Sequence, residues 1–171
     1  MRTLSYVLLL TGLFACRKAA DTPVIESQTS GTTIDSAQFP SVDDSSLTIA
    51  GLHVGQHESQ VRALLGQPVT ESKPESSEVL AEPSRTLSYA DLSVGLVGHR
   101  VDAIMCLGTS CATADGVRIG DDRSKIEHLY GRGRYTSDGL LTYLARRSDC
   151  AIAFSLYRDT VGTFKVWCQE S

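Results

Sequence analysis

The sequence predicts an α+β fold of two tandem repeats, each a short helix followed by a three-stranded antiparallel sheet, with the helices on one face. The first observation behind this is a motif that occurs twice, as Gly51–Gly66 and Gly116–Gly131, at a constant offset of 65 residues (116 minus 51). The second is that alternating apolar segments typical of strands follow each copy. The third is the spacing of the cysteines, which agrees with the pairing of those strands.

Each copy of the motif predicts one short helix. Apolar residues at the i, i+3 and i+4 spacing of one helix face are Val61, Leu64 and Leu65 in the first copy, and Ile126, Leu129 and Tyr130 in the second. His57 or a neighbour caps the first helix, and Asp121 or Asp122 is placed to cap the second. Gly66 and Gly131 end the two helices.

Three strand candidates follow each helix. They are Thr86–Ala90, Leu92–Val97 and Arg100–Cys106 in the first repeat, and Leu140–Leu144, Cys150–Leu156 and Gly162–Cys168 in the second. Residues 67–84, between the first helix and its strands, are expected to form a loop or a mobile insertion. A turn at Gly98 and His99 pairs Leu92 with Met105, Val94 with Ala103, and Leu96 with Val101. Centring the second hairpin on Asp159 pairs Ile152 with Val166, and Phe154 with Phe164.

The hairpin registers also predict two disulfides. The second hairpin places Cys150 opposite Cys168, which is the geometry of a cross-strand bridge. The first places Asp91 opposite Cys106, so we expect Cys106 to pair with Cys111, which follows it after four residues. Cys-x4-Cys differs from the Cys-x-x-Cys of thioredoxin-like redox motifs, so a redox or metal site is the less favoured interpretation.

The N-terminus resembles a bacterial lipoprotein signal. A short cationic start precedes an apolar stretch at Leu4–Phe14, which is too short to span a bilayer, and Leu13-Phe-Ala-Cys16 looks like a lipobox. We therefore predict a signal peptide at 1–15 and a lipid-modified Cys16, although Phe14 departs from the usual lipobox. The alternative is an ordinary secretory site with an unmodified Cys16. Since Arg17 follows the cysteine, the resemblance to enteric lipoproteins implies an outer-membrane protein that faces the periplasm.

The remaining boundaries follow from composition. Residues 19–46 are rich in Ser, Thr and acidic side chains and contain no Lys or Arg. Such a segment buries too little apolar surface to fold, so residues 16–46 are expected to be a lipid-anchored, disordered linker. The first α/β repeat then spans 47–111 and the second spans 112–171.

The sequence gives little support for catalysis or for cofactors. The net charge of −4, without a basic stripe, disfavours nucleic acid as a partner. His53 and His57 lack a third ligand nearby, so no zinc site is expected. His57 and Ser59 could belong to a catalytic triad, but no Gly-x-Ser-x-Gly elbow is present. We expect no enzyme, no metal, no cofactor and no small-molecule substrate.

The outward face of the second hairpin is the candidate binding surface. Trp167, Tyr157 and Lys165 are predicted to point away from the core, together with Ala151 and Ala153. An exposed Trp and Tyr on an open sheet are typical of protein-binding surfaces. Packing of Trp167 under the linker or the other repeat is an equally open alternative. A group of arginines is either a solvated face or a surface for an acidic partner: Arg132, Arg134, Arg146 and Arg147.

Five short motifs suggest a family. They are Gly-Leu-x-x-Gly at 51–55, Leu-Leu-Gly-x-Pro at 64–68, Leu-Ser-Tyr at 87–89, Leu-x-Val at 92–94 and Arg-Val-x-x-Ile at 100–104. In this order they resemble the SmpA/OmlA (BamE-like) lipoprotein domain, and two copies with cysteines resemble beta-lactamase inhibitory protein. The resemblance implies a non-catalytic scaffold that presents a sheet face to a protein in the periplasm or outer membrane, as an inhibitor or docking module. The alternative that it implies is a structural accessory of outer-membrane assembly or envelope integrity.

Overall fold

The computed structural model describes residues 39–77, 79–80 and 82–169, all within the unit Ile34–Ser171. The signal peptide, Cys16 and the linker up to residue 38 lie outside the described residues. The helices of the described part are η2 (Asp44–Ser46), α1 (Glu58–Leu65) and α2 (Arg123–Tyr130). The strands of its first half are β1 (Ser41–Val42), β2 (Thr70–Glu71), β3 (Ser84–Ser88), β4 (Leu92–Val97) and β5 (Arg100–Cys106). Those of its second half are β6 (Arg134–Tyr135), β7 (Leu141–Ala145), β8 (Cys150–Tyr157) and β9 (Thr160–Cys168).

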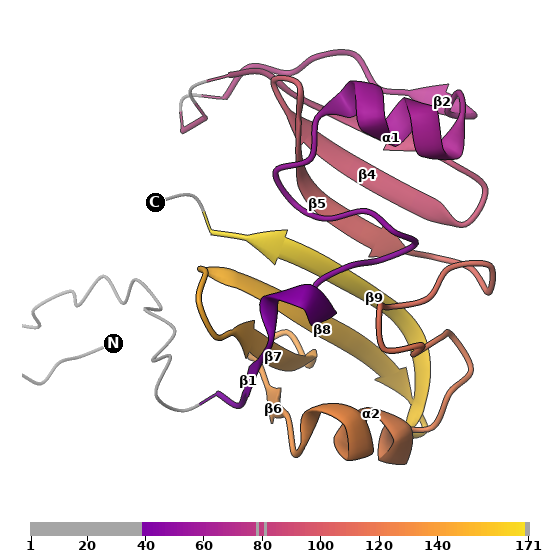
Figure 1. Ribbon diagram of the computed structural model, residues 1–171, viewed down its shortest axis with the longest axis vertical. Coiled ribbons are helices and arrows are strands. Elements are labelled where there is room, and N and C mark those ends of the chain that lie inside the picture. Colours follow the sequence, from indigo (N-terminus) through magenta and orange to yellow (C-terminus); the bar gives the residue numbers. More distant parts are fainter. Residues whose placement is uncertain (1–38, 78, 81, 170–171) are drawn as a thin grey trace, which may run out of the picture. The chain divides into compact units, whose positions relative to one another are not determined.

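All these strands belong to a single mixed sheet, in the order β1-β7-β8-β9-β5-β4-β3-β2, with β6 also paired to β7 (Figure 1). The prediction of two repeats, each with its own three-stranded sheet, is therefore wrong. The difference arises because β5 and β9 pair antiparallel, with Ala103 opposite Trp167 and Cys106 opposite Phe164. As the edges of separate sheets, both strands would expose unpaired N–H and C=O groups, and their pairing satisfies these groups.

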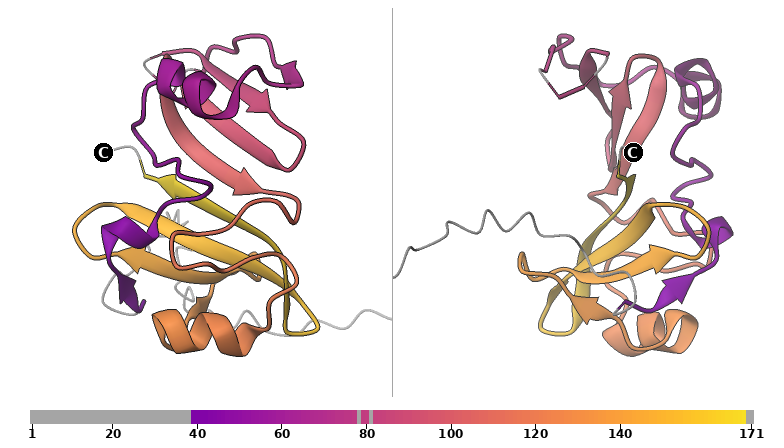
Figure 2. Two further views of the ribbon diagram at one scale, coloured as in Figure 1. Left: turned by 45° about the vertical axis from the view of Figure 1, so that its right-hand side comes forward. Right: turned by 90° about the vertical axis from the view of Figure 1, so that its left-hand side faces the viewer.

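Both helices lie on the same face of the sheet (Figure 2). The residues that α1 buries are Glu58 and Val61, and α2 buries Ile126 and Tyr130. Leu64 and Leu129, predicted on the apolar helix faces, are instead 54% and 42% exposed. Each short helix rests on the sheet along one line of residues. Leu64 and Leu129 follow the buried Val61 and Ile126 by three residues, which places them about 60° around the helix from that line at 3.6 residues per turn.

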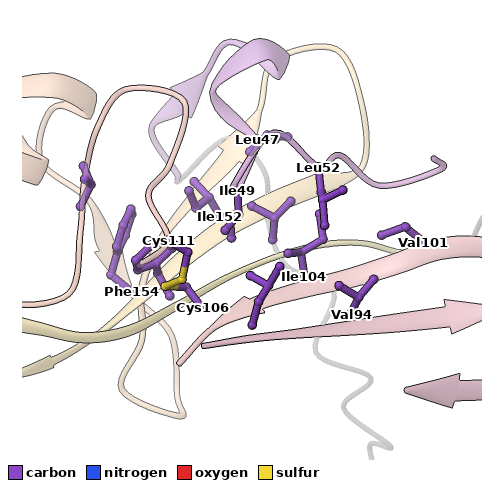
Figure 3. Packing of buried hydrophobic residues seen from close by; sticks show 14 of the residues in the cluster. Leu47, Ile49, Leu52, Val94, Val101, Ile104, Cys106, Cys111, Ile152 and Phe154 are labelled. Carbon is purple, nitrogen blue, oxygen red and sulfur yellow. A yellow bond between two sulfur atoms is a disulfide. The ribbon is translucent and has the colours of Figure 1, made fainter. Parts of the chain in front are cut away.

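The connector between η2 and α1 closes the core across the line where β5 meets β9. Ile49 and Leu52 are fully buried, and Figure 3 shows them on the same side of the sheet as Ile104 of β5 and Ile152 of β8. Ile49 also forms a backbone bridge to Thr113 in the connector that precedes α2. The buried side chains therefore form one continuous cluster that includes residues from both halves of the sheet.

The end of the predicted linker belongs to the fold. β1 pairs with β7 in parallel, and Val42 is buried. Asp43 Oδ1 accepts a hydrogen bond of 3.0 Å from Arg146 Nη1, over a separation of 103 residues. Residues 41–46 were assigned to the linker from local composition, which contains no information about partners so distant in sequence.

The register of the β4–β5 hairpin corrects the predicted one. Leu96 lies opposite Val101 as predicted, but the pairing then shifts by one residue, so that Val94 lies opposite Ile104 and Leu92 opposite Cys106. Asp102 is the extra residue of a β-bulge, which bends the strand and changes which side chains face the core. Ile104 and Cys106 are consequently buried, in place of the predicted Ala103 and Met105.

The β8–β9 hairpin contains an equivalent bulge, and here the predicted register is confirmed. The observed pairs are Cys150 with Cys168, Ile152 with Val166, and Phe154 with Phe164. The turn is formed by Arg158 and Asp159, both at positive φ, and Gly162 is the extra residue of the bulge. Centring the hairpin on Asp159 implies a turn of three residues, one more than observed, and the bulge residue Gly162 compensates for this difference, so the predicted register farther along the strands is correct.

Candidate protein-binding face

Both cysteine pairs expected from the sequence are disulfide-bonded in the structure, as Cys106–Cys111 and Cys150–Cys168. The first closes the connector that follows β5. The prediction of this bridge assumed that Asp91 lies opposite Cys106, whereas the bulge places Leu92 opposite Cys106. The second bridge joins β8 to β9 at the open end of their hairpin. It therefore holds the end of the strand that carries Trp167, the residue immediately before Cys168.

Trp167 and Lys165 lie together on the outer face of the sheet, opposite the helices. Their strand neighbours Phe164 and Val166 are buried in the core, and side chains alternate along a strand. Lys165 Nζ lies 4.6 Å from the centroid of the Trp167 ring, within the range of a cation–π interaction. Ala151 of β8 pairs with Trp167 on its other side. The Trp167 indole is thus partly exposed, and its partners on the two neighbouring strands, Ala103 and Ala151, are small.

The other predicted members of this face lie in different surroundings. Ala151 and Ala153 do point to the outer face, but both are buried rather than open. Tyr157 is 69% exposed and stacks with Arg158, whose guanidinium carbon lies 5.2 Å from the ring centroid. Tyr157 follows Ala151, the partner of Trp167, by six positions in β8, which corresponds to about 20 Å along a strand. The structure therefore brings Trp167 and Lys165 together and leaves Tyr157 at the far end of the hairpin.

A hollow of about 550 Å³ adjoins Trp167. It lies where the start of the described chain, the turn between β7 and β8, and the end of β9 come together. Its lining side chains are aromatic, small or charged, and the ones used below are Phe39, Arg146, Arg147, Asp149 and Trp167. Its volume is within the range of about 300–1,000 Å³ that is usual for ligand pockets.

The charges at the hollow are only partly paired. Arg146 forms an ion pair with Asp43, with 3.0 Å between Nη1 and Oδ1. The backbone N–H of Arg147 donates to Asp44 Oδ1 over 3.1 Å, which fixes the turn. The guanidinium of Arg147 has no hydrogen-bond or ion-pair partner among residues 39–77, 79–80 and 82–169. An exposed cation thus lines the same hollow as Trp167.

Sequence reasoning missed this hollow because it treated its parts separately. Phe39 was assigned to the linker, and Arg146 and Arg147 to a group of arginines without a defined position. One signal was available, namely that the acidic pair Asp43 and Asp44 complements that arginine pair. The structure places the two pairs side by side.

A second concentration of polar groups lies between α1 and the sheet. Glu58 is only 8% exposed, and its Oε1 accepts a hydrogen bond of 2.7 Å from Arg62 Nη2. Arg85 of β3 also donates to Glu58, and both arginines contact Glu71. His99 Nδ1 lies 3.0 Å from Glu58 Oε2. Burial raises the pKa of Glu58, but the hydrogen bonds from His99 and Arg62 and the charges of Arg85 and Arg62 outweigh it and lower that pKa.

The histidines considered for chemistry have local structural roles. The His57 side chain accepts a hydrogen bond of 3.2 Å from the backbone N–H of Ser59 and so caps α1. The Ser59 hydroxyl lies 2.9 Å from the same ring nitrogen, whereas the Glu58 carboxylate contacts His99. His53 Nδ1 lies 3.3 Å from the side-chain oxygen of Gln56. Ser59 therefore contacts His57, while the Glu58 carboxylate contacts a different histidine, His99.

Comparison with known proteins gives similarity of fold. No family model and no curated protein matches the chain. A cysteine-rich secretory protein from Staphylococcus aureus subsp. aureus Mu50 has a TM-score of 0.55 and 11% identity, over 74% of this chain and 48% of that chain. An extracellular protein with an SCP domain, from Bacillus anthracis str. Ames, has a TM-score of 0.45 and 9% identity, over 68% and 44% of the two chains. The aligned part thus spans about half of each solved protein.

These findings contradict the resemblance to SmpA/OmlA domains and beta-lactamase inhibitory protein. The solved protein with a TM-score of 0.55 is described as a cysteine-rich secretory protein. The glycine motif fixes where a helix begins and ends, but it does not determine how strands join into a sheet. The likeness to the staphylococcal protein, at 11% identity, concerns the fold alone.

In the described part of the chain, no helix has the length and apolar character needed to cross a membrane.

Proposed function

We propose that this chain is a non-catalytic protein of the bacterial cell envelope that binds another protein through the outer face of its sheet, at Trp167. The observation that carries the proposal is Trp167 itself, partly exposed beside Lys165 and adjoining the 550 Å³ hollow. Tryptophan next to a cavity is the kind of residue that contributes most binding energy at protein interfaces. The protein acts as a docking module for that partner.

The proposal also places the chain on the periplasmic side of the outer membrane, anchored by a lipid on Cys16. Its support is the lipobox-like sequence Leu13-Phe-Ala-Cys16. A role as an accessory of outer-membrane assembly is not carried forward, because it followed from the resemblance that the comparisons contradict. Mass spectrometry of the mature N-terminus tests the anchor, and an unmodified Cys16 would contradict it.

Photo-crosslinking in cells tests the binding face. A photoreactive amino acid replaces Met105, which is exposed beside Lys165 on the outer face, and in a control it replaces Leu64, which is exposed on α1. We expect a discrete crosslinked product from position 105 and none from position 64. Adding Trp167→Ala should weaken binding about 30-fold, corresponding to about 2 kcal/mol, and remove the product.

Two controls make this result interpretable. Urea unfolding of Trp167→Ala shows whether the variant keeps its fold, and Tyr157→Ala tests whether any exposed aromatic residue has the same effect. A product that persists in folded Trp167→Ala, or that forms equally from position 64, would refute the proposed face.

A further inference from the structure

We propose that the hollow beside Trp167 receives an acidic segment of the partner protein, with an Asp or Glu side chain bound to Arg147 and an apolar side chain against Trp167. This inference rests on the proposed function, since it names the chemistry of the partner at the same face. It also gives a specific role to two arginines that sequence analysis left between a solvated face and an acidic partner, Arg146 and Arg147.

The charges at the hollow favour an acidic segment. The chain as a whole is acidic, with a net charge of −4, but cationic side chains gather at this hollow. Arg146 and Arg147 line it, and Lys165 lies against Trp167 at its edge. Asp149 is the carboxylate among the lining residues. Because Asp43 already compensates Arg146, the positive charge available to a partner is that of Arg147 and Lys165, against the carboxylate of Asp149, and it favours a partner segment of negative charge.

The two arginines differ in what they already bind. Arg146 is paired with Asp43, so its charge is compensated within the chain. Arg147 has no such partner within the part of the chain that the structure describes. A guanidinium presents several N–H donors in a plane and can bind a carboxylate through two of them. Arg147 is therefore the group with unused binding capacity.

The backbone on both sides of the hollow is preorganised. The turn that carries Arg147 is held at two points, by its own N–H on Asp44 Oδ1 at 3.1 Å and by the Arg146 N–H on the Val42 carbonyl at 2.9 Å. On the opposite side of the hollow, the disulfide Cys150–Cys168 fixes the strand end next to Trp167. A site whose backbone is already fixed loses less conformational entropy on binding.

The opposing hypothesis is a basic segment bound by Asp149, and charge reversal at Asp149 is therefore the matched control for charge reversal at Arg147. If the segment were basic, Asp149 would be its contact, and Arg147 would repel it. Reversing each charge separately distinguishes these cases, because Arg147→Glu and Asp149→Lys have opposite effects on an acidic segment. Arg132→Glu reverses an exposed arginine that is not among the residues lining the hollow, and it controls for the general change in net charge.

The test selects a phage-displayed library of random peptides on the purified full-length chain, and the selected peptides are then synthesised. We expect enrichment of Asp or Glu next to an aromatic or aliphatic residue. In fluorescence polarisation, Arg147→Glu should weaken such a peptide at least about tenfold, while Asp149→Lys should leave it unchanged or bind it more tightly. Arg132→Glu should change binding less than about twofold.

The outcomes separate this inference from the proposed function. Peptides that depend on Trp167 but are basic, or that lose affinity with Asp149→Lys and not with Arg147→Glu, would overturn the acidic partner and leave the binding face intact. Peptides that bind folded Trp167→Ala as well as the unaltered chain would contradict the face itself. Selection of no peptide that depends on Trp167 would count against both.

Discussion

The junctions of α1 and α2 with the sheet share a backbone arrangement but have opposite charges. The backbone N–H of Glu58, the first residue of α1, donates to the His99 carbonyl over 2.8 Å. The N–H of Arg123, the first residue of α2, donates to the Asp159 carbonyl over the same 2.8 Å. Each helix therefore begins on the turn of the hairpin that follows it.

The side chains at these equivalent positions exchange sign. Glu58 pairs with Arg62 four residues later at 2.7 Å, and Arg123 pairs with Glu127 at 2.8 Å. Asp159, at the turn next to α2, lies 3.7 Å from Arg123. At α1 the corresponding turn residue is His99, which contacts Glu58. Both junctions thus satisfy the same local pattern with opposite charges.

The two junctions differ in the contacts between helix and sheet. In α1 the first-turn carboxylate is buried, and Arg85 of β3 adds a second cation to it. In α2 the pair is more exposed, 36% and 28% for its two side chains, and the contact with the sheet is aromatic. Tyr130 packs against Tyr143 and Phe154, with ring centroids 5.4 and 6.0 Å away. One junction depends on a partly buried ion network, and the other on an aromatic core.

The largest expected effect is the loss of a disulfide. Replacing Cys150 and Cys168 by Ser should lower the free energy of unfolding by about 3 kcal/mol, since the bridge closes a loop of 18 residues. The bridge Cys106–Cys111 closes only 5, and its loss should cost about 2 kcal/mol. Urea unfolding of both double variants measures this, and a larger loss for the shorter loop would contradict the chain-entropy argument.

The ion network is tested by removing the first-turn charge of each helix. Glu58→Ala should lower the free energy of unfolding by about 2 kcal/mol, because the partly buried Arg62 and Arg85 lose the more buried of the two carboxylates they share and keep only Glu71. Arg123→Ala should cost less than about 1 kcal/mol, because its pair is exposed. Equal losses in urea unfolding would mean that burial does not distinguish the junctions.

Acid should weaken the α1 junction. The pKa of Glu58 is lowered in the folded chain, so its contribution is present above the pKa of an unfolded Glu and is lost as pH falls through the folded value. Stability measured from pH 6 downward should therefore fall less steeply in Glu58→Gln than in the unaltered chain. Identical slopes would exclude Glu58 as a source of the acid sensitivity.

Alkali should weaken the α2 junction. Burial, followed by the charge of Glu127, raises the pKa of Tyr143 to about 12, and burial also raises the pKa of Tyr130. A raised folded pKa gives a contribution to stability that is present below pH 10, the usual pKa of tyrosine, and is lost as pH rises toward about 12. Tyr143→Phe should flatten this alkaline loss in urea unfolding, whereas Glu58→Gln should not.

The smallest expected difference lies at the helix caps. His57→Ala should cost about 0.5–1 kcal/mol, because the His57 side chain accepts the Ser59 N–H and Gln60 completes a capping box. Asp122, the N-cap of α2, makes no side-chain capping bond, so Asp122→Ala should cost only about 0.3 kcal/mol. The neighbouring Asp121 instead accepts from the Arg118 N–H at 2.7 Å. A larger loss for Asp122→Ala in urea unfolding would contradict this assignment.

Much of the local structure could be read from the sequence. Glycines at Gly66 and Gly131 and apolar spacing placed both helices, because these signals depend on residues within one or two turns. Alternation placed the strands, and β4 and β5 have the predicted bounds, Leu92–Val97 and Arg100–Cys106. At the candidate site, sequence reasoning found Trp167 and Lys165 because their orientation follows from alternation along one strand.

The tertiary structure alone decided how these elements join. The pairing of β5 with β9, the docking of β1 on β7, and the hollow formed by Phe39, Arg147 and Trp167 bring together residues far apart in sequence. The bulge at Asp102 reverses which side chains of β5 face the core, although the strand retains its alternating pattern. Periodicity describes one segment at a time. The pairing of strand edges and the burial of charges depend on contacts between segments distant in sequence, so they are visible only in the folded chain.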